Sequence, residues 1–135
     1  MAKYAQHTKV PVDRSRNEIE ATLARYGATQ FVYGHDEKRA VIGFSMSERT
    51  IRFDLPIEGL SEKEERQRWR ALALVIKSKL ESIECSIEEF DEAFLAQIVL
   101  PNGSRVGQWV SPQIAAAYKT GQMPKLLLAG PEAVT

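Results

Sequence analysis

The chain has few of the residues that build metal and disulfide sites. Its 135 residues include one cysteine, Cys85, and two histidines, His7 and His35. A single cysteine excludes an internal disulfide framework and fits a reducing compartment. Because none of the three residues stands at ligand spacing from another, we expect no metal site and no cofactor.

The chain also lacks an excess of charge and a long apolar run. Lysines and arginines equal aspartates and glutamates at 18 each, so nucleic acid or an acidic membrane would be attracted only by a local patch. No stretch approaches the roughly 20 apolar residues of a membrane span, and the first residues, MAKYAQHTKVPV, lack the apolar centre of a signal peptide. We therefore expect a cytoplasmic protein that does not enter a membrane.

Sequence motifs for catalysis are missing as well. There is no Gly-x-Ser-x-Gly elbow, phosphate loop or dinucleotide fingerprint. The carboxylates crowd the first turns of the expected helices, where the helix dipole accounts for them. We expect a protein that is not an enzyme.

The longest periodic stretch covers residues 61–84, SEKEERQRWRALALVIKSKLESIE. Ser61 and Glu64 match a capping box, and apolar residues then recur at steps of three and four, which predicts a helix with one core face. Leu74 and Val75 lie off that face, so the middle of the helix needs cover from a sheet, another helix or a second subunit. We expect self-association, with a two-fold dimer as the default.

Residues 31–33, 40–47 and 49–55 alternate in the manner of antiparallel strands, with one face toward the core and one toward water. In the third strand this leaves Arg49, Arg52 and Asp54 on or near the wet face. The predicted fold is α+β: a three-stranded antiparallel sheet packed on the long helix, with additional short helices.

Two further Ser-x-x-Glu pairs predict shorter helices. Ser15 with Glu18 predicts a helix over residues 16–26, and Ser86 with Glu89 predicts another after the long helix.

The C-terminal third is less regular in sequence. Residues 97–110 contain Pro-Asn-Gly-Ser and form either a small hairpin or an irregular loop. Ser111 and Pro112 predict the cap of a last helix that stops at Gly121.

The chain reads as one domain, residues 15–128, between an extended basic arm, 1–14, and a flexible tail, 129–135. Residues 126–128, all leucine, are expected to dock on the domain.

Two local groups of cations could contact phosphates, one in and just after the arm and one along the flanks of the long helix. The alternative for both is an ordinary solvated surface, with lysine and arginine stems lying over apolar residues and pairing with glutamates. The candidate nucleic-acid-binding residues are Lys9, Arg14, Arg16, Arg66, Arg68, Arg70 and Lys77.

Four stretches carry a resemblance to known proteins: VPVDRSRNEIEATLARYGATQFVYG, AVIGF, RQRWRALALVIKSKLESIE and EEFDEAFLAQIVLPNGSRVGQWVSPQIAAAYKTGQMP. They resemble a family of small proteins of tailed phages and prophages, which implies an accessory role in the cytoplasm of an infected bacterium. The expected order of elements also resembles the βββα core of single-strand annealing proteins of phage recombination, which form rings that hold single-stranded DNA in a basic groove.

These observations leave two functional hypotheses. The first is a non-catalytic phage accessory protein that binds nucleic acid, single-stranded DNA included, in replication or recombination, through charge rather than base reading. The second is a protein-interaction module that inhibits a host factor such as a defence enzyme. The basic arm and helix flanks favour the first hypothesis, and the zero net charge favours the second.

Overall fold

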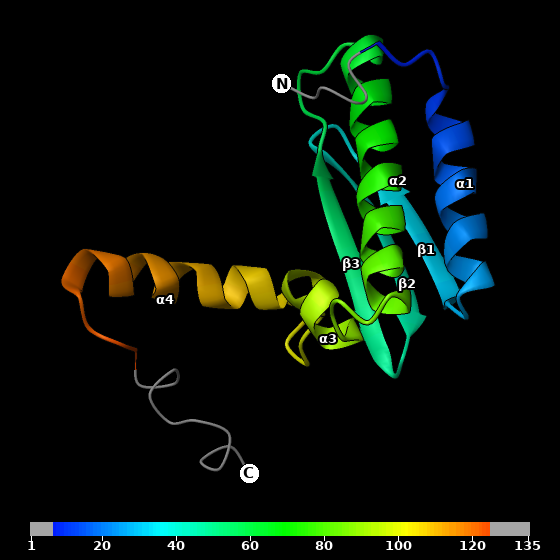
Figure 1. Cartoon of the computed structure of the whole chain (residues 1–135). Helices are drawn as coiled ribbons and strands as arrows, with labels where there is room; N and C mark the ends of the chain where they lie inside the picture. The colour runs from blue at the N-terminus through cyan, green and yellow to red at the C-terminus, as the bar shows by residue number, and fades with distance from the viewer. Residues whose placement is uncertain (1–6, 125–135) are drawn as a thin grey trace.

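The computed structural model describes residues 7–124 and has the predicted α+β fold (Figure 1). The expected tail and the leucines at 126–128 lie outside the described residues, as does the first part of the arm. The elements in chain order are α1 (Val12–Arg25), β1 (Thr29–His35), β2 (Arg39–Met46), β3 (Arg49–Pro56), α2 (Glu62–Glu84), α3 (Phe90–Ala93), a 3-10 turn (Leu95–Gln97) and α4 (Val106–Thr120).

The three strands form an antiparallel sheet in the order β1-β2-β3. β2 and β3 pair in register along their whole length, because Ser47 and Glu48 between them both have positive φ, 51° and 60°, as a two-residue hairpin turn requires. β1 is less regular: its register with β2 shifts between Thr29 and Val32, and Gln30 has a φ of 55°. This irregularity is a bulge in an edge strand.

One face of the sheet packs against α1 and α2, which lie side by side and begin at the same end of the molecule (Figure 1). Trp69, Ile76 and Leu80 of α2 are almost completely buried. They meet alternate residues of the strands, among them Ile42 and Phe44. The match between the apolar face of the helix and the apolar face of the sheet is as the sequence predicts.

The start of α2 is confirmed in detail. The Ser61 hydroxyl accepts a hydrogen bond from the Glu64 N–H, and the Glu64 carboxylate accepts one from the Ser61 N–H, each at 3.2 Å. The Ser61 N–H and then its hydroxyl lower the pKa of Glu64, because both donate to the ionised carboxylate.

The other two predicted capping boxes are wrong. α1 begins at Val12, and Ser15 lies inside it, fully buried, with its N–H donating to the Pro11 carbonyl at 3.1 Å. Ser86 has a φ of 59° and lies in the turn that ends α2, so it cannot begin a helix. The next helix, α3, is instead capped by Glu89.

The C-terminal part decides one open alternative and corrects one prediction. Of the hairpin and the loop predicted as alternatives for residues 97–110, the structure has the loop: residues 98–105 carry two isolated bridges, Ile51 to Ile98 and Val99 to Arg105, and α4 begins at Val106. Ser111 and Pro112 do not cap a helix but lie within α4. The predicted stop at Gly121 is confirmed by its left-handed φ of 73°.

Figure 1 shows α4 projecting from the body of the molecule. Among the described residues, none of α4 is buried.

Candidate nucleic-acid interface

The cations predicted in and just after the arm are only partly available. Lys9 and Arg14 are exposed and make no ion pair within the described residues, and Arg14 belongs to α1 rather than to an extended arm. Arg16 lies 4.2 Å from the centre of the Tyr33 ring and 3.4 Å from the Asp13 carboxylate. Its guanidinium group is therefore already engaged by a ring and a carboxylate of the same chain.

The predicted cations of α2 do not form one patch. Arg70 makes a 2.6 Å ion pair with Glu18 of α1, and the Nε of Arg66 is buried. Arg68 lies on the other flank, where it donates to the Pro56 carbonyl at 2.9 Å. Within residues 7–124, Lys77 and Arg68 are both exposed and make no ion pair, but Arg68 is held by the Pro56 carbonyl. Arg70 therefore joins two helices rather than presenting its charge to a ligand.

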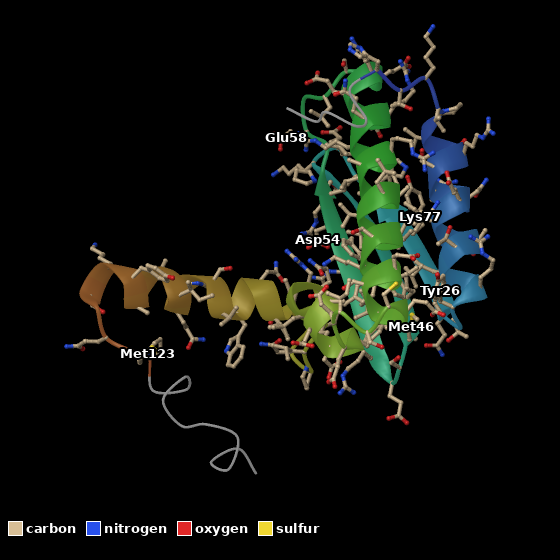
Figure 2. The ribbon with its side chains drawn as sticks, viewed as in Figure 1. Tyr26, Met46, Asp54, Glu58, Lys77 and Met123 are labelled. Atoms are coloured by element: carbon tan, nitrogen blue, oxygen red, sulfur yellow. The ribbon has the colours of Figure 1, made fainter. Side chains whose placement is uncertain are left out.

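A second cationic cluster, not predicted from the sequence as a site, lies on the sheet face opposite α1 and α2. We call it the Asp54 cluster. Asp54 alternates with the buried Phe53, so its side chain points away from α2. In Figure 2, Asp54 and Lys77 are labelled on opposite sides of α2.

Three arginines converge on the Asp54 carboxylate. Its distances are 2.9 Å to Nε of Arg52, 3.2 Å to Nε of Arg105 and 3.6 Å to Nη1 of Arg39. The Asp54 side chain is only 11% exposed, whereas that of Arg39 is 56% exposed. Three positive charges against one negative charge leave a local excess of two.

Arg52 also fixes the loop before α4. Its Nη1 donates to the Gly103 carbonyl at 2.9 Å, and its Nη2 donates to the Gln108 side chain at 3.3 Å. The guanidinium is thereby held in one orientation.

A shallow hollow of about 300 Å³ adjoins the Asp54 cluster on the same face. Val32, Val41 and Gly43 make its apolar part, while the Ser45 hydroxyl donates to the Gln30 side chain at 2.8 Å on its polar rim. Gly43 leaves the hollow open, because a side chain at this position would project into it.

Possible metal ligands are dispersed over the described residues. These contain no group of three or more histidine, cysteine, aspartate or glutamate side chains placed to hold a metal ion. His35 packs 5.7 Å from the Tyr33 ring, measured between ring centres, and Cys85 is exposed at the end of α2.

The chain folds as a small α+β domain with three arginines gathered around Asp54 on one face of the sheet. No protein-family model, curated protein or solved structure matches the chain. Across residues 7–124, no helix has the length and apolar character needed to cross a membrane.

Proposed function

We propose that the protein is a non-catalytic phage accessory protein that binds single-stranded nucleic acid in the host cytoplasm, in replication or recombination. The observation that carries the proposal is the Asp54 cluster, in which Arg39, Arg52 and Arg105 surround one carboxylate on the open face of the sheet. The resemblance to phage proteins supplies the biological setting.

The cluster provides a phosphate site without requiring a basic protein. The Asp54 carboxylate holds the three guanidinium groups together, which would otherwise repel one another. It cancels only one of their charges, so the face keeps its attraction for phosphate. Arg39 is the most exposed of the three and is the side chain we expect to contact phosphate directly.

The hollow beside the cluster accounts for a preference for single strands. An unpaired base can lie on Val32, Val41 and Gly43 while its phosphate reaches Arg52, which also borders the hollow. Bases in a duplex are stacked inside the helix and cannot enter it. Among the described residues that line the hollow, Phe44 is the one aromatic, and it is 1% exposed, so its ring offers no surface for base stacking. Binding should therefore be governed mainly by charge and should depend strongly on salt.

The test is fluorescence anisotropy with labelled single- and double-stranded DNA and RNA at low and moderate salt. Arg39→Gln with Arg52→Gln removes two charges from the open face, and Arg14→Gln with Lys77→Gln removes two from the predicted helix side. We expect the first pair to weaken single-strand binding at least about tenfold and to reduce the salt slope by about 1.4, since each phosphate contact contributes about 0.7.

The second pair of substitutions should change affinity by less than about threefold, because the long-range field of exposed charges is largely screened. Thermal melting of both pairs would verify that they are folded. Absence of binding at low salt, or equal losses in the two pairs, would contradict the proposal.

A second candidate is the protein-interaction module that inhibits a host factor. The observation that favours it is the exposed apolar surface of α4 on a protein of zero net charge. Stoichiometric capture of one host protein by a chain that binds no nucleic acid at low salt would favour this candidate over the first.

A further inference from the structure

Two apolar surfaces of this chain have no partner within residues 7–124. The first is a stripe on α4 formed by Val110, Ile114 and Tyr118, which follow one another at steps of four and so lie along one side of the helix. Ile114 is 44% exposed and Tyr118 is 88% exposed. No residue of α4 is buried in the described structure, so the exposed part of this stripe is available to a partner.

The second surface is a groove along the C-terminal half of α2. Leu74 and Val75, the residues that lie off the core face, form its apolar part, and Ile87 beyond the helix end forms its far wall. Ser78 and Ser82 lie between them and leave room for another backbone to approach. Ile87 is 77% exposed, which is unusual for an isoleucine unless it is covered in an assembly.

The α4 helix of a chain is held away from the α2 groove of the same chain. The residues just before it are fixed to β3, where the Val99 N–H donates to the Thr50 carbonyl at 2.8 Å and Arg105 pairs with Asp54. At the first turn, Gly107 packs so closely on Ala96 that a Cβ atom would lie 3.1 Å from the Ala96 carbonyl oxygen. To reach the groove, α4 would have to break these contacts.

The two surfaces match in length and in charge. From Val110 to Tyr118 and from Leu74 to Ser82 are both eight residues, or about 12 Å of helix. The helix α4 has no acidic residue and carries Lys119 near its end, whereas Glu81, Glu88 and Lys79 border the groove and leave it a net charge of minus one. The stripe of one chain is held away from the groove of the same chain. Two chains can therefore satisfy both surfaces if each places its α4 in the groove of the other.

We propose that α4 of one copy of this chain lies in the α2 groove of a second copy, and that the second α4 returns the contact to give a two-fold dimer. In this dimer, α4 of the second copy covers Leu74 and Val75, for which the sequence predicts cover from a sheet, another helix or a second subunit. It does not rest on the nucleic-acid function, because the Asp54 cluster and its hollow lie on a different face.

Cys85 provides a direct test, since it is the single cysteine of the sequence and its thiol contacts Glu81 at the border of the groove. A tagged chain that keeps Cys85 would be mixed with a differently tagged Cys85→Ser chain that carries either Val110→Cys or Tyr118→Cys. A short bis-maleimide should join the two tags through one of these positions, and the position that reacts gives the direction of α4 in the groove. Cys85→Ser with Glu37→Cys, at a distant turn, is the matched control and should give only background.

Light scattering of the unmodified protein at the crosslinking concentration should report the mass of two chains. Ile114→Glu should return it to the mass of one chain without unfolding it, because Ile114 is exposed. A monomeric unmodified protein would overturn the proposal, since the groove would then await a foreign protein or remain open. Crosslinking no better than the Glu37→Cys control at both positions, or a dimer that Ile114→Glu leaves intact, would also overturn it.

Discussion

The body of the molecule and its C-terminal helix are positioned by different forces. α2 buries five residues against the sheet and α1, whereas α4 buries none in the described structure although its sequence is richer in apolar residues. The contacts that fix α4 lie in residues 98–105 and at its first turn: Arg105 pairs with Asp54, Arg52 donates to the Gly103 carbonyl, a short bridge joins β3, and Gly107 packs on Ala96. A helix can thus be placed by contacts at its N-terminal end alone, and its apolar surface then stays exposed.

The largest contrast should come from truncating one apolar side chain in each region. Ile76→Ala should lower the free energy of unfolding by about 2 to 5 kcal/mol, because Ile76 is fully buried and a cavity would replace it, and Leu72→Ala should fall in the same range. Ile114→Ala should change the value by less than about 0.5 kcal/mol in the dilute monomer. Urea unfolding would measure all three. Near-neutral changes in the free energy of unfolding for the two α2 substitutions, or a large change for Ile114→Ala, would contradict the difference in packing between α2 and α4.

The contacts of Asp54, which hold the loop before α4, should show an intermediate effect. Asp54→Asn should cost about 1 to 2 kcal/mol, because three guanidinium groups lose their shared carboxylate while remaining partly hydrated. Asp91→Asn, which removes the exposed partner of Arg49, is the control and should cost less than about 1 kcal/mol. Thermal or urea unfolding gives the cost, and hydrogen exchange over residues 98–105 should quicken only in Asp54→Asn. Unchanged exchange over residues 98–105 would mean that Asp54 does not hold this loop in place.

A smaller effect should distinguish Ser61 from Ser111, both of which the sequence predicts as helix caps. Ser61→Ala should cost about 1 kcal/mol, because it removes a side-chain cap of α2. Ser111→Ala should be within about 0.5 kcal/mol, since Ser111 lies inside α4 and caps nothing. Equal losses in chemical unfolding would indicate that α4 begins near Ser111.

The smallest effect concerns acid. The fold lowers the pKa of two carboxylates of the body, Glu64 through the Ser61 N–H and hydroxyl, and Asp36 through the N–H groups of Arg39 and Lys38. A lowered folded pKa stabilises the folded state above the unfolded value of about 4, and that contribution is lost as the pH falls through the folded pKa. Glu64→Gln with Asp36→Asn should therefore lose less stability than the unmodified chain between neutral and acid pH, as measured by melting temperature. A steeper loss would contradict the assignment.

The parts of the fold that the sequence predicts are those with repeating patterns. Alternation along β2 and β3 and the three-four spacing of α2 each involve many residues, so a single exception does not change the prediction. The four-residue Ser-x-x-Glu pattern is weaker. It marks a helix start at Ser61, falls inside a helix at Ser15 and follows a helix end at Ser86, because charged helices contain such pairs whether or not a helix begins there.

The candidate site was harder to predict, since it depends on pairs from distant parts of the sequence. Helical spacing places Arg70 on a flank of α2 but does not reveal that Glu18 of α1 will neutralise it. Strand alternation does place Arg52 and Asp54 on the wet face. Arg105 joins them from 51 residues away, and no local pattern indicates that.

The bulge in β1 has a consequence for the protein at high concentration. β1 is an edge strand whose outer N–H and C=O groups meet no other strand among residues 7–124, and such an edge can recruit strands from other chains into an aggregate. The shift between Thr29 and Val32, with the left-handed Gln30, breaks that edge into two short pieces that a straight incoming strand cannot pair with throughout. The irregularity therefore makes open-ended growth of the sheet at β1 less favourable.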